Sequence, residues 1–589
     1  MKDKKRKKPS GRKESLAPQN IIVGIWVMLT LTIFPLYYRN DYYDILSAKF
    51  YFYCVITGIM IGLVIGYQLI SGNVVSWIRS SIESISSDGF VAWVKKTYSI
   101  ADICIIVFIL SATISTLIAG VDAPLAQINE TKSVILGQGE DMMLSASDMI
   151  YCAFTGKEGR YTGLMLLLFY FLAYMCVTRC FRFSKKYAWC FLVFGALVCI
   201  FGITDHLGYD VLSMRGEVFE RNNPQALHSF VSTIGNINTY TTFVGFCLVL
   251  SGTLFVMSRE RARVVAFYVV TLAIAFMAMA MGSSDNGYLT LAAFFGLLPL
   301  VAFRTWTGIR RYVVALAMFF TDIKLVTIID EIYGDKAWGI DGLFNNISQS
   351  QFLMPIIIVL WILAIILYVP TIKKLARKEA STIETSDRAP RAILIAWAAL
   401  MVVGIVAAIV FIIYANTNTS DARYGWLGSL KYYFVFNDAW GTYRGYVWKA
   451  GMEMFSGLPI IHQIFGTGPD TFGLYMLTRY YEMVDTTSQI YDSAHNEYLQ
   501  YLFTIGIAGL VSYLGLLIST VYGAFKKARR IEEGDTKFEP TAAAFVIACA
   551  YLVMCYACQA TVNINLPIST PILWTFIMIV GSMVRRKDS

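Results

Sequence analysis

The chain has 589 residues, of which 57% are hydrophobic and only 15% are charged, and its formal net charge is +9. Soluble domains are about half apolar and about a quarter charged, so this composition excludes an ordinary soluble protein and indicates one that is solvated largely by lipid. The positive charge does not indicate nucleic-acid binding, because the basic residues lie in short blocks between apolar runs, as in membrane proteins.

Apolar runs long enough to cross a bilayer recur along the whole chain. A transmembrane helix needs about 20 mostly apolar residues, and no run alternates with the period of a barrel strand. The sequence therefore predicts an all-α polytopic membrane protein with about fourteen transmembrane helices. The predicted spans are 20–38, 50–70, 98–120, 161–178, 187–206, 235–257, 264–282, 288–303, 312–330, 352–370, 392–414, 499–522, 541–562 and 571–584.

The basic residues predict the orientation of these helices. Lys and Arg concentrate in the first residues and then in every second loop, which places both termini in the cytoplasm of a multi-pass cell-membrane protein. The predicted organisation is a basic cytoplasmic tail, helices one to eleven, a large extracytoplasmic loop, helices twelve to fourteen and a second cytoplasmic tail. The corresponding ranges are 1–19, 20–414, 415–498, 499–584 and 585–589.

Length and polarity accumulate on the predicted outer side. Three loops there, 121–160, 207–234 and 415–498, are of a length that is usually functional or disordered. The last is rich in Tyr, Trp and Gly and is interrupted by short apolar stretches, which favours a partly helical cap on the membrane surface. The four histidines of the protein also fall on this side: His206, His228, His462 and His495.

The sharpest candidate for chemistry precedes the span at 499–522. His495 is followed by Asn496, and Gly506 and Gly509 lie further along. If a helix starts at the histidine, His495 and Gly506 fall on nearly one face, and the two glycines let a neighbouring helix or a lipid chain approach closely. Imidazole titrates near neutral pH, which suits proton transfer. An interfacial histidine that only caps a helix is the alternative.

Arginine and asparagine side chains provide further candidates. Arg444 and Trp448 share a helical face at i,i+4, and a guanidinium fork suits phosphate oxygens. The alternative is a snorkelling arginine with an aromatic partner at the interface. Arg160, at the mouth of the span 161–178, is another outer arginine. Asn236 and Asn238 open the span 235–257, where they can cap the helix or line a cavity.

The sequence does not favour metal or nucleotide chemistry. No two histidines lie at metal-ligand spacing, and no HExxH motif or Asp-rich sugar-nucleotide signature occurs. Walker-type glycine-rich loops are also absent from the sequence, which disfavours an ATP-driven transporter.

In order and spacing, these segments resemble one known family. His495-Asn496 followed by Gly506 and Gly509 is similar to the H-[N/S/Q]-x9-G-x-x-[G/T/Y] motif of the O-antigen ligase and O-antigen polymerase superfamily. Four further segments resemble other parts of its signature, namely Arg444 to Trp448, Gly466 to Phe472, Gly235 to Asn238 and Gly159 to Leu164. The likeness is close over 420–520 and weaker over 155–300, so the family-like region is predicted at about 155–520.

The resemblance implies a GT-C-like fold and a glycosyltransferase that works on the outer leaflet without a metal or another cofactor. The donor would be a glycan on undecaprenyl diphosphate, and the acceptor a hydroxyl of lipid A core or of another lipid-linked repeat. His495 would bind or deprotonate the acceptor and Arg444 would hold the diphosphate, since an arginine clamp can replace a metal. Six residues are further candidates for substrate contacts: Arg160, Asn236, Asn238, Arg423, Trp448 and Asn496.

The chain departs from the family pattern in two respects. The family often has Ser-Arg-Gly at the outer end of a mid-chain span, whereas residues 281–288 contain no arginine, so Arg160 becomes the first candidate for a second phosphate clamp. The number of predicted spans also exceeds that usual for the ligases. The sequence does not separate ligase from polymerase activity, nor does it exclude a protein acceptor.

Two other classes of protein are compatible with the membrane topology. A flippase or secondary transporter of a lipid-linked glycan should show internal repeats and broken helices, and no convincing repeat is present. A structural membrane subunit would have no need of so polar a cluster at one interface.

Overall fold

The computed structural model describes residues 17–137, 143–216, 229–376, 387–417, 431–534, 538–539 and 541–585. In this part the chain is almost entirely helical, and its one sheet consists of β1 (Phe230–Val231) paired antiparallel with β2 (Gly235–Asn236). The predicted all-α class is therefore confirmed.

Twelve helical segments in the described residues are long and apolar enough to cross a membrane, and two shorter apolar helices accompany them. Each predicted span corresponds to one of these segments, so the chain is a multi-pass membrane protein. Their bounds are α1 (Pro18–Leu36), α2 (Ile45–Ile70), α5 (Ile100–Leu117), α8 (Leu164–Cys180), α9 (Lys185–His206), α11 (Ile237–Met257), α12 (Ala262–Gly282), α13 (Asp285–Leu297) with α14 (Pro299–Ala302), α15 (Trp306–Tyr333), α17 (Leu353–Ala376), α19 (Arg391–Thr417), α26 (Glu497–Glu532), α27 (Thr541–Gln559) and α28 (Thr570–Arg585).

Shorter helices connect these segments, and the long segment between α19 and α26 is partly helical. They are α3 (Asn73–Asp88), α4 (Phe90–Thr97), α6 (Leu125–Leu136), α7 (Ala146–Thr155), η3 (Gly334–Lys336), α16 (Gly342–Ser348), α21 (Lys431–Phe434), α22 (Trp440–Gly457), α23 (Ile460–Phe465), α24 (Phe472–Met476), η5 (Leu477–Arg479), α25 (Tyr480–Thr487) and η6 (Ala560–Val562).

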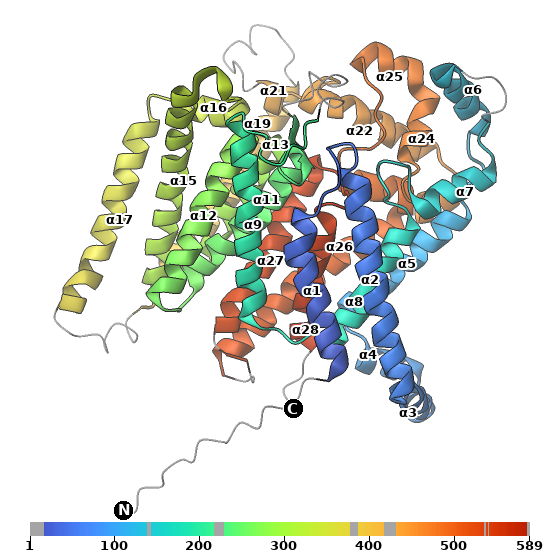
Figure 1. The fold of residues 1–589 in the computed structure, drawn as a ribbon, viewed down its shortest axis with the longest axis horizontal. Helices are drawn as coiled ribbons and strands as arrows, with labels where there is room; N and C mark the ends of the chain where they lie inside the picture. The colour runs from blue at the N-terminus through green and yellow to red at the C-terminus, as the bar shows by residue number, and fades with distance from the viewer. Residues whose placement is uncertain are drawn as a thin grey trace, which may run out of the picture.

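The centre of the bundle is α11, in which residues 239–256 are all buried. It packs against α12 and α27, while α26 packs against α5 and α27 (Figure 1). At the other extreme, Ala415 is the one buried residue that the described structure contains in α19. An apolar helix that the protein does not cover needs lipid around it, so α19 lies at the rim of the bundle.

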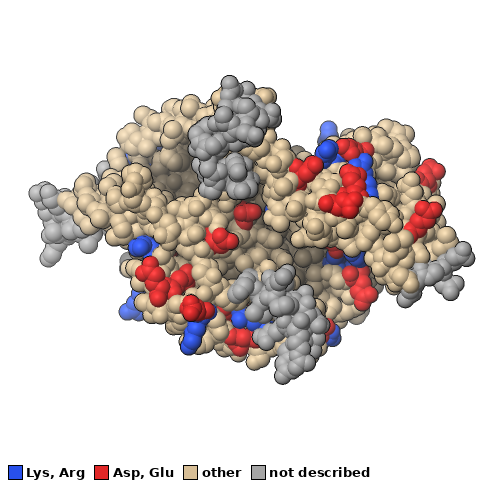
Figure 2. Space-filling model, turned by 90° about the horizontal axis from the view of Figure 1, so that it is seen from above, with Lys and Arg blue, Asp and Glu red and all other residues tan. Residues whose placement is uncertain are grey.

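The two ends of the bundle carry different charged residues and connecting helices. At the lower end in Figure 1, Asp102 at the start of α5 pairs with Arg585 of α28 at 2.8 Å and lies 3.8 Å from Arg179 of α8. The opposite end, at which α2, α8, α11 and α26 begin, is called the upper end. It carries α6, α7 and the helices between α19 and α26. Figure 2 views this end from above and shows a surface hollowed near its middle, with acidic and basic side chains around the hollow.

Candidate active site

The helix α26 begins after His495 rather than at it. Asn496 caps the helix, because its Oδ1 accepts hydrogen bonds from the backbone N–H groups of Tyr498 at 3.0 Å and Leu499 at 3.1 Å. His495 lies outside the helix with φ of +46°, and Gly506 interrupts the helix with φ of +76°. The predicted alignment of His495 and Gly506 on one helical face is therefore wrong: the cap excludes the histidine, and the glycine breaks the face.

The break at Gly506 lets the backbone before the Gly466 turn lie directly against α26. A Cβ on Gly506 would meet the carbonyl oxygen of Ile464 at 2.3 Å, and a Cβ on Gly466 would meet that of Thr504 at 2.3 Å. The Thr504 carbonyl that the break releases accepts a hydrogen bond from the Gly468 backbone N–H at 3.0 Å. Both glycines are thus required by the close approach of two backbones.

The helix α5 packs on α26 at the same level. Ser115 Oγ donates to the Thr504 carbonyl at 2.5 Å, and Ser111 Oγ donates to the Ile505 carbonyl at 2.9 Å. The same Ser111 oxygen would lie 3.6 Å from a Cβ on Gly509. These bonds satisfy carbonyls that a kinked helix leaves without partners, so the break beneath the histidine is a fixed feature of the fold.

The backbone just before His495 is held from two directions. The Ala494 N–H donates to Gln500 Oε1 at 3.0 Å, and the Ala494 carbonyl accepts from Trp448 Nε1 at 2.9 Å. An indole has a single hydrogen-bond donor, and that of Trp448 is used to position this turn. Gln500 was not among the predicted site residues, and the signal for it was its place in the string from His495 to Gln500.

The imidazole of His495 is partly exposed, and no hydrogen bond joins it to another residue in the described ranges. Tyr491 lies beside it with ring centroids 5.8 Å apart. Burial and then the charges of Arg444 and Arg160 lower the pKa of His495 to about 4, and Asp492 opposes this shift. The structure thus brings both predicted arginines close to a histidine that is neutral at neutral pH.

Arg444 begins the regular part of α22. The three residues before it, Gly441, Thr442 and Tyr443, all have positive φ. Arg444 Nη1 donates to the Gly441 carbonyl at 2.8 Å and lies 3.9 Å from Asp285, while its buried Nε has no hydrogen-bond partner among the described residues. Burial lowers the pKa of Arg444, and Asp285 opposes that effect only in part. Arg444 is therefore a buried cation with little local compensation.

Arg160 is also buried, but carboxylates compensate it. Its Nε lies 2.8 Å from Asp470 Oδ1, and its Nη1 lies 3.4 Å from Asp492 Oδ1. Burial alone would lower the pKa of Arg160, but the two carboxylates outweigh burial and raise it. Its Nη2 is the one donor of this guanidinium that has no partner in the described part of the chain.

Asp470 joins two segments that lie far apart in the sequence. Besides Arg160, it binds the backbone N–H of Lys157, at 2.8 Å, and the Lys157 Nζ pairs with Asp492 at 3.2 Å. The segments 159–164 and 466–472, which resemble separate parts of the family signature, are thereby brought together beside His495. Asp470 and Asp492 were not among the predicted site residues, because long-range ion pairs leave no local pattern.

Unusual backbone conformations are concentrated at this site. Among the described residues, eleven other than glycine have positive φ, and five of them lie here: Tyr161, Thr442, Tyr443, Asp470 and His495. Such conformations are costly and persist where the surrounding structure enforces them, which happens most often at functional sites.

The asparagines at the start of α11 support the fold. Asn236 Oδ1 accepts from the Asn238 N–H at 2.9 Å, which caps the helix, and Asn238 Oδ1 accepts from Ser284 Oγ at 2.5 Å. Asn286 Nδ2 donates to the Asn238 carbonyl at 2.7 Å. The segment 281–288, which lacks the expected arginine, thus contributes to this network and supplies Asp285 to the surroundings of Arg444.

Other predicted residues lie elsewhere. His206 Nε2 is 2.8 Å from Asp330, and both ring nitrogens of His462 contact backbone carbonyls. Arg423 and His228 lie outside the described residues. Within the described ranges, no three His, Cys, Asp or Glu side chains form a group that could hold a metal ion.

The fold and the site together describe a many-helix membrane protein with a partly exposed histidine beside two buried arginines. Residues 340–514 match the sequence model of the family described as O-Antigen ligase. This range contains α22, Arg444, His495 and the break in α26, and it confirms the resemblance to the O-antigen ligase superfamily. The match supports an O-antigen ligase- or polymerase-like membrane function in polysaccharide biosynthesis. A comparison with curated proteins gave no match.

Proposed function

We propose that this protein is a metal-independent glycosyltransferase that transfers or polymerises a glycan from undecaprenyl diphosphate to an acceptor hydroxyl on the extracytoplasmic face of the membrane. The observation that carries the proposal is the proximity of a neutral imidazole, His495, to the poorly compensated guanidinium of Arg444. The concentration of Lys and Arg in the loops of the opposite end supports an extracytoplasmic position for this site.

Arg444 is suited to hold the diphosphate of the donor. Its buried Nε has no partner in the described structure, and the one carboxylate near it, that of Asp285, is 3.9 Å away and half exposed. A diphosphate would supply the oxygens and the negative charge that this guanidinium lacks. Arg160 can add one donor, Nη2, because Asp470 and Asp492 engage the rest of its guanidinium.

His495 is suited to accept the proton of the acceptor. The acceptor oxygen forms a bond with the anomeric carbon of the donor sugar, and the bond from that carbon to the diphosphate oxygen breaks. The hydroxyl proton passes to the imidazole, and polyprenyl diphosphate leaves with the bonding electron pair. Arg444 stabilises the charge that develops on the leaving oxygens. Trp448, Gln500 and Asn496 position the turn that carries His495.

Donor binding would also strengthen the base. In the empty site, burial and the charges of Arg444 and Arg160 lower the pKa of His495 to about 4. A bound diphosphate offsets those cationic charges, so the pKa of His495 rises towards its ordinary value. The imidazole then becomes a more effective proton acceptor when the donor is in place.

The test is product analysis with the purified full chain in lipid nanodiscs. Wild-type protein and the variants H495A, R444A and Lys449→Ala are incubated with the polyprenyl-diphosphate glycan extracted from producing cells, and the products are analysed by mass spectrometry. We expect a new glycosidic bond with wild type and with K449A, whose exposed lysine is on the same helix as Arg444, and at least about a hundredfold less product with H495A or R444A. Full activity of H495A would overturn the assignment, and passage of the glycan across the bilayer without a new bond would indicate a transporter instead.

A further inference from the structure

A cavity at the upper end lies beside the group of charged residues around His495, here called the charged site (Arg160, Arg444, Asp470, Asp492 and His495), and none of these five residues lines it. Its volume is about 460 Å³, within the range typical of small-molecule sites. Its lining comes from the α1–α2 connection, the 157–161 loop, the sheet and the α27–α28 connection, with Tyr42, Tyr43, Asp44, Glu158, Tyr161, Phe230 and Asn236 among the contributing residues.

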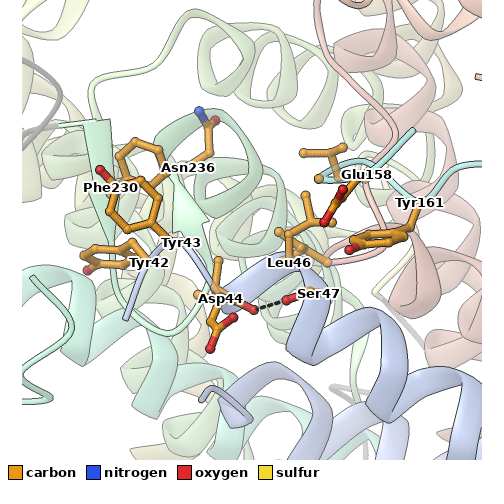
Figure 3. A pocket seen from close by; sticks show the side chains of 13 residues that line it. Tyr42, Tyr43, Asp44, Leu46, Ser47, Glu158, Tyr161, Phe230 and Asn236 are labelled. Carbon is orange, nitrogen blue, oxygen red and sulfur yellow. Dashed lines mark hydrogen bonds between the residues drawn. The ribbon is translucent and has the colours of Figure 1, made fainter. Parts of the chain in front are cut away.

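The lining combines aromatic rings with a few oxygen acceptors. Figure 3 shows Tyr42, Tyr43 and Phe230 on one side of the cavity, Tyr161 and Glu158 on the other, and the Asp44 side chain below. Aromatic rings offer flat apolar faces, while carboxylate oxygens accept charge-assisted hydrogen bonds from hydroxyl groups. A pyranose ring presents this combination of apolar C–H faces and equatorial hydroxyls.

Among the described residues, Glu158 gives the cavity an uncompensated negative charge, whereas the second carboxylate, Asp44, is paired with Arg39 at 3.2 Å. Hydrogen bonds from Arg39 lower the pKa of Asp44, so Asp44 is ionised at neutral pH. Glu158 is exposed and makes no ion pair with a residue of the described chain. The Glu158 carboxylate repels a diphosphate or an acidic sugar and accepts hydrogen bonds from an uncharged one.

The cavity and the charged site share one loop. Glu158, Gly159 and Tyr161 line the cavity, whereas Arg160, between them, pairs with Asp470. The charge of Arg160 reaches His495, so the loop of residues 157–161 borders both regions. A glycan attached to a diphosphate or to an attacking hydroxyl at the charged site can therefore extend along this loop into the cavity.

We propose that this cavity is a glycan subsite that binds an uncharged sugar ring of the donor or of the acceptor, an inference that rests on the proposed function. The diphosphate and the sugar are thus held by different chemistry: guanidinium groups near His495 for the former, and aromatic rings with carboxylates in the cavity for the latter. Specificity for the glycan resides in the cavity, and the transfer step resides at His495 and Arg444.

The test compares a double variant of the cavity with a matched control. Tyr43→Ala with Glu158→Gln removes one ring and one carboxylate, and Tyr43 is 50% exposed, so the fold should tolerate the change. The control, Tyr151→Ala with Glu130→Gln, changes the same residue types on α7 and α6, where Tyr151 is 69% exposed and neither residue lines the cavity. The probe is the glycan released by mild acid from the lipid-linked donor, with its binding followed by saturation-transfer NMR.

We expect the released glycan to bind wild type, H495A, R444A and the control alike, and to bind the cavity variant about tenfold or more weakly. Equal binding to the cavity variant and the control, or no binding to wild type, would overturn the subsite. In steady-state kinetics, a raised KM for the donor or for the acceptor identifies which glycan occupies the cavity. If wild type bound the glycan but formed no glycosidic bond, the proposed function would fail while the subsite stood.

Discussion

His462 and His495 lie in the same segment between α19 and α26, but the protein treats them differently. His462 is 1% exposed, and its Nδ1 and Nε2 lie 2.9 Å and 2.8 Å from the backbone carbonyls of Gly466 and Val121. His495 is partly exposed and has no hydrogen bond to another described residue, although the backbone before it is held on both sides. The His462 ring joins two segments of the chain, whereas both ring nitrogens of His495 are available for a substrate.

The two arginines repeat this contrast. Arg160 is engaged by Asp470 and Asp492, whereas Arg444 has one backbone carbonyl and one distant carboxylate. A buried polar group is normally satisfied by its surroundings, so a well-positioned group that is not satisfied points to a ligand. His462 and Arg160 therefore build the site, whereas His495 and Arg444 are available to a substrate.

Truncation of each histidine should give the largest difference between the two. H495A should lower kcat by about 10²–10⁴-fold without changing the thermal unfolding midpoint, because the variant loses a proton acceptor but no structural bond. His462→Ala should lower the free energy of unfolding by about 1–3 kcal/mol and leave the turnover of the folded fraction nearly intact, because a buried ring and its hydrogen bond to a backbone carbonyl are lost. Steady-state kinetics and thermal denaturation in detergent measure both. The reverse pattern would exchange the two roles.

The arginines give the next largest effect. R444A should lower the rate of transfer by about 10²–10³-fold, as expected when a donor to the developing leaving-group charge is removed, and should fold normally. Arg160→Ala should instead lower the free energy of unfolding by about 3–5 kcal/mol, because it leaves the buried Asp470 carboxylate without its ion-pair partner. Accumulation in the membrane and unfolding in detergent distinguish the two outcomes. If R160A were stable but inactive, the role of binding the diphosphate would be assigned to Arg160 instead of Arg444.

The pH dependence of transfer should differ between the empty and the donor-occupied site. The lowered pKa of His495 means that the ring is neutral above about pH 4 and is lost as a base when pH falls through that value. The acid limb of kcat/KM, which reports the unoccupied enzyme, should therefore lie near pH 4, and that of kcat should lie at higher pH because the bound diphosphate raises the pKa. Initial rates at a range of donor concentrations test this. In Arg444→Gln, the kcat/KM limb should move upward; an unchanged limb would exclude Arg444 as a cause of the shift.

The transmembrane organisation was predictable because it depends on the length of apolar runs. Even α8 and α28, which are shorter than the other spans, were placed by hydrophobicity alone. The shared helical face of His495 and Gly506 was wrong because neither a helix cap nor a helix break leaves a mark in the hydrophobic periodicity. Asn496 caps the helix with its side chain, and Gly506 leaves the helical conformation where another segment crosses.

The site was predictable only where residues lie in recognisable strings. His495 and Arg444 were found through such strings, and the structure brings them close to each other. Their surroundings were not foreseen, because Asp470 reaches Arg160 across more than half the chain and Asp285 belongs to a different helix from Arg444. These long-range contacts determine how far the charge of each arginine is compensated, and therefore which arginine can bind a substrate.

The smallest predicted effect concerns Asp285, the one carboxylate within ion-pair distance of Arg444 in the described structure. Asp285→Asn should leave kcat unchanged and lower the donor KM by up to about fivefold, because a half-exposed carboxylate at 3.9 Å competes only weakly with a diphosphate. Asp438→Asn is the matched control: its carboxylate also lies 3.9 Å from a cation, Lys449, and is 50% exposed. The gain should shrink as salt is added, since screening already weakens an exposed pair. A donor KM that rose in D285N but not in D438N would make Asp285 part of the binding site rather than a competitor for Arg444.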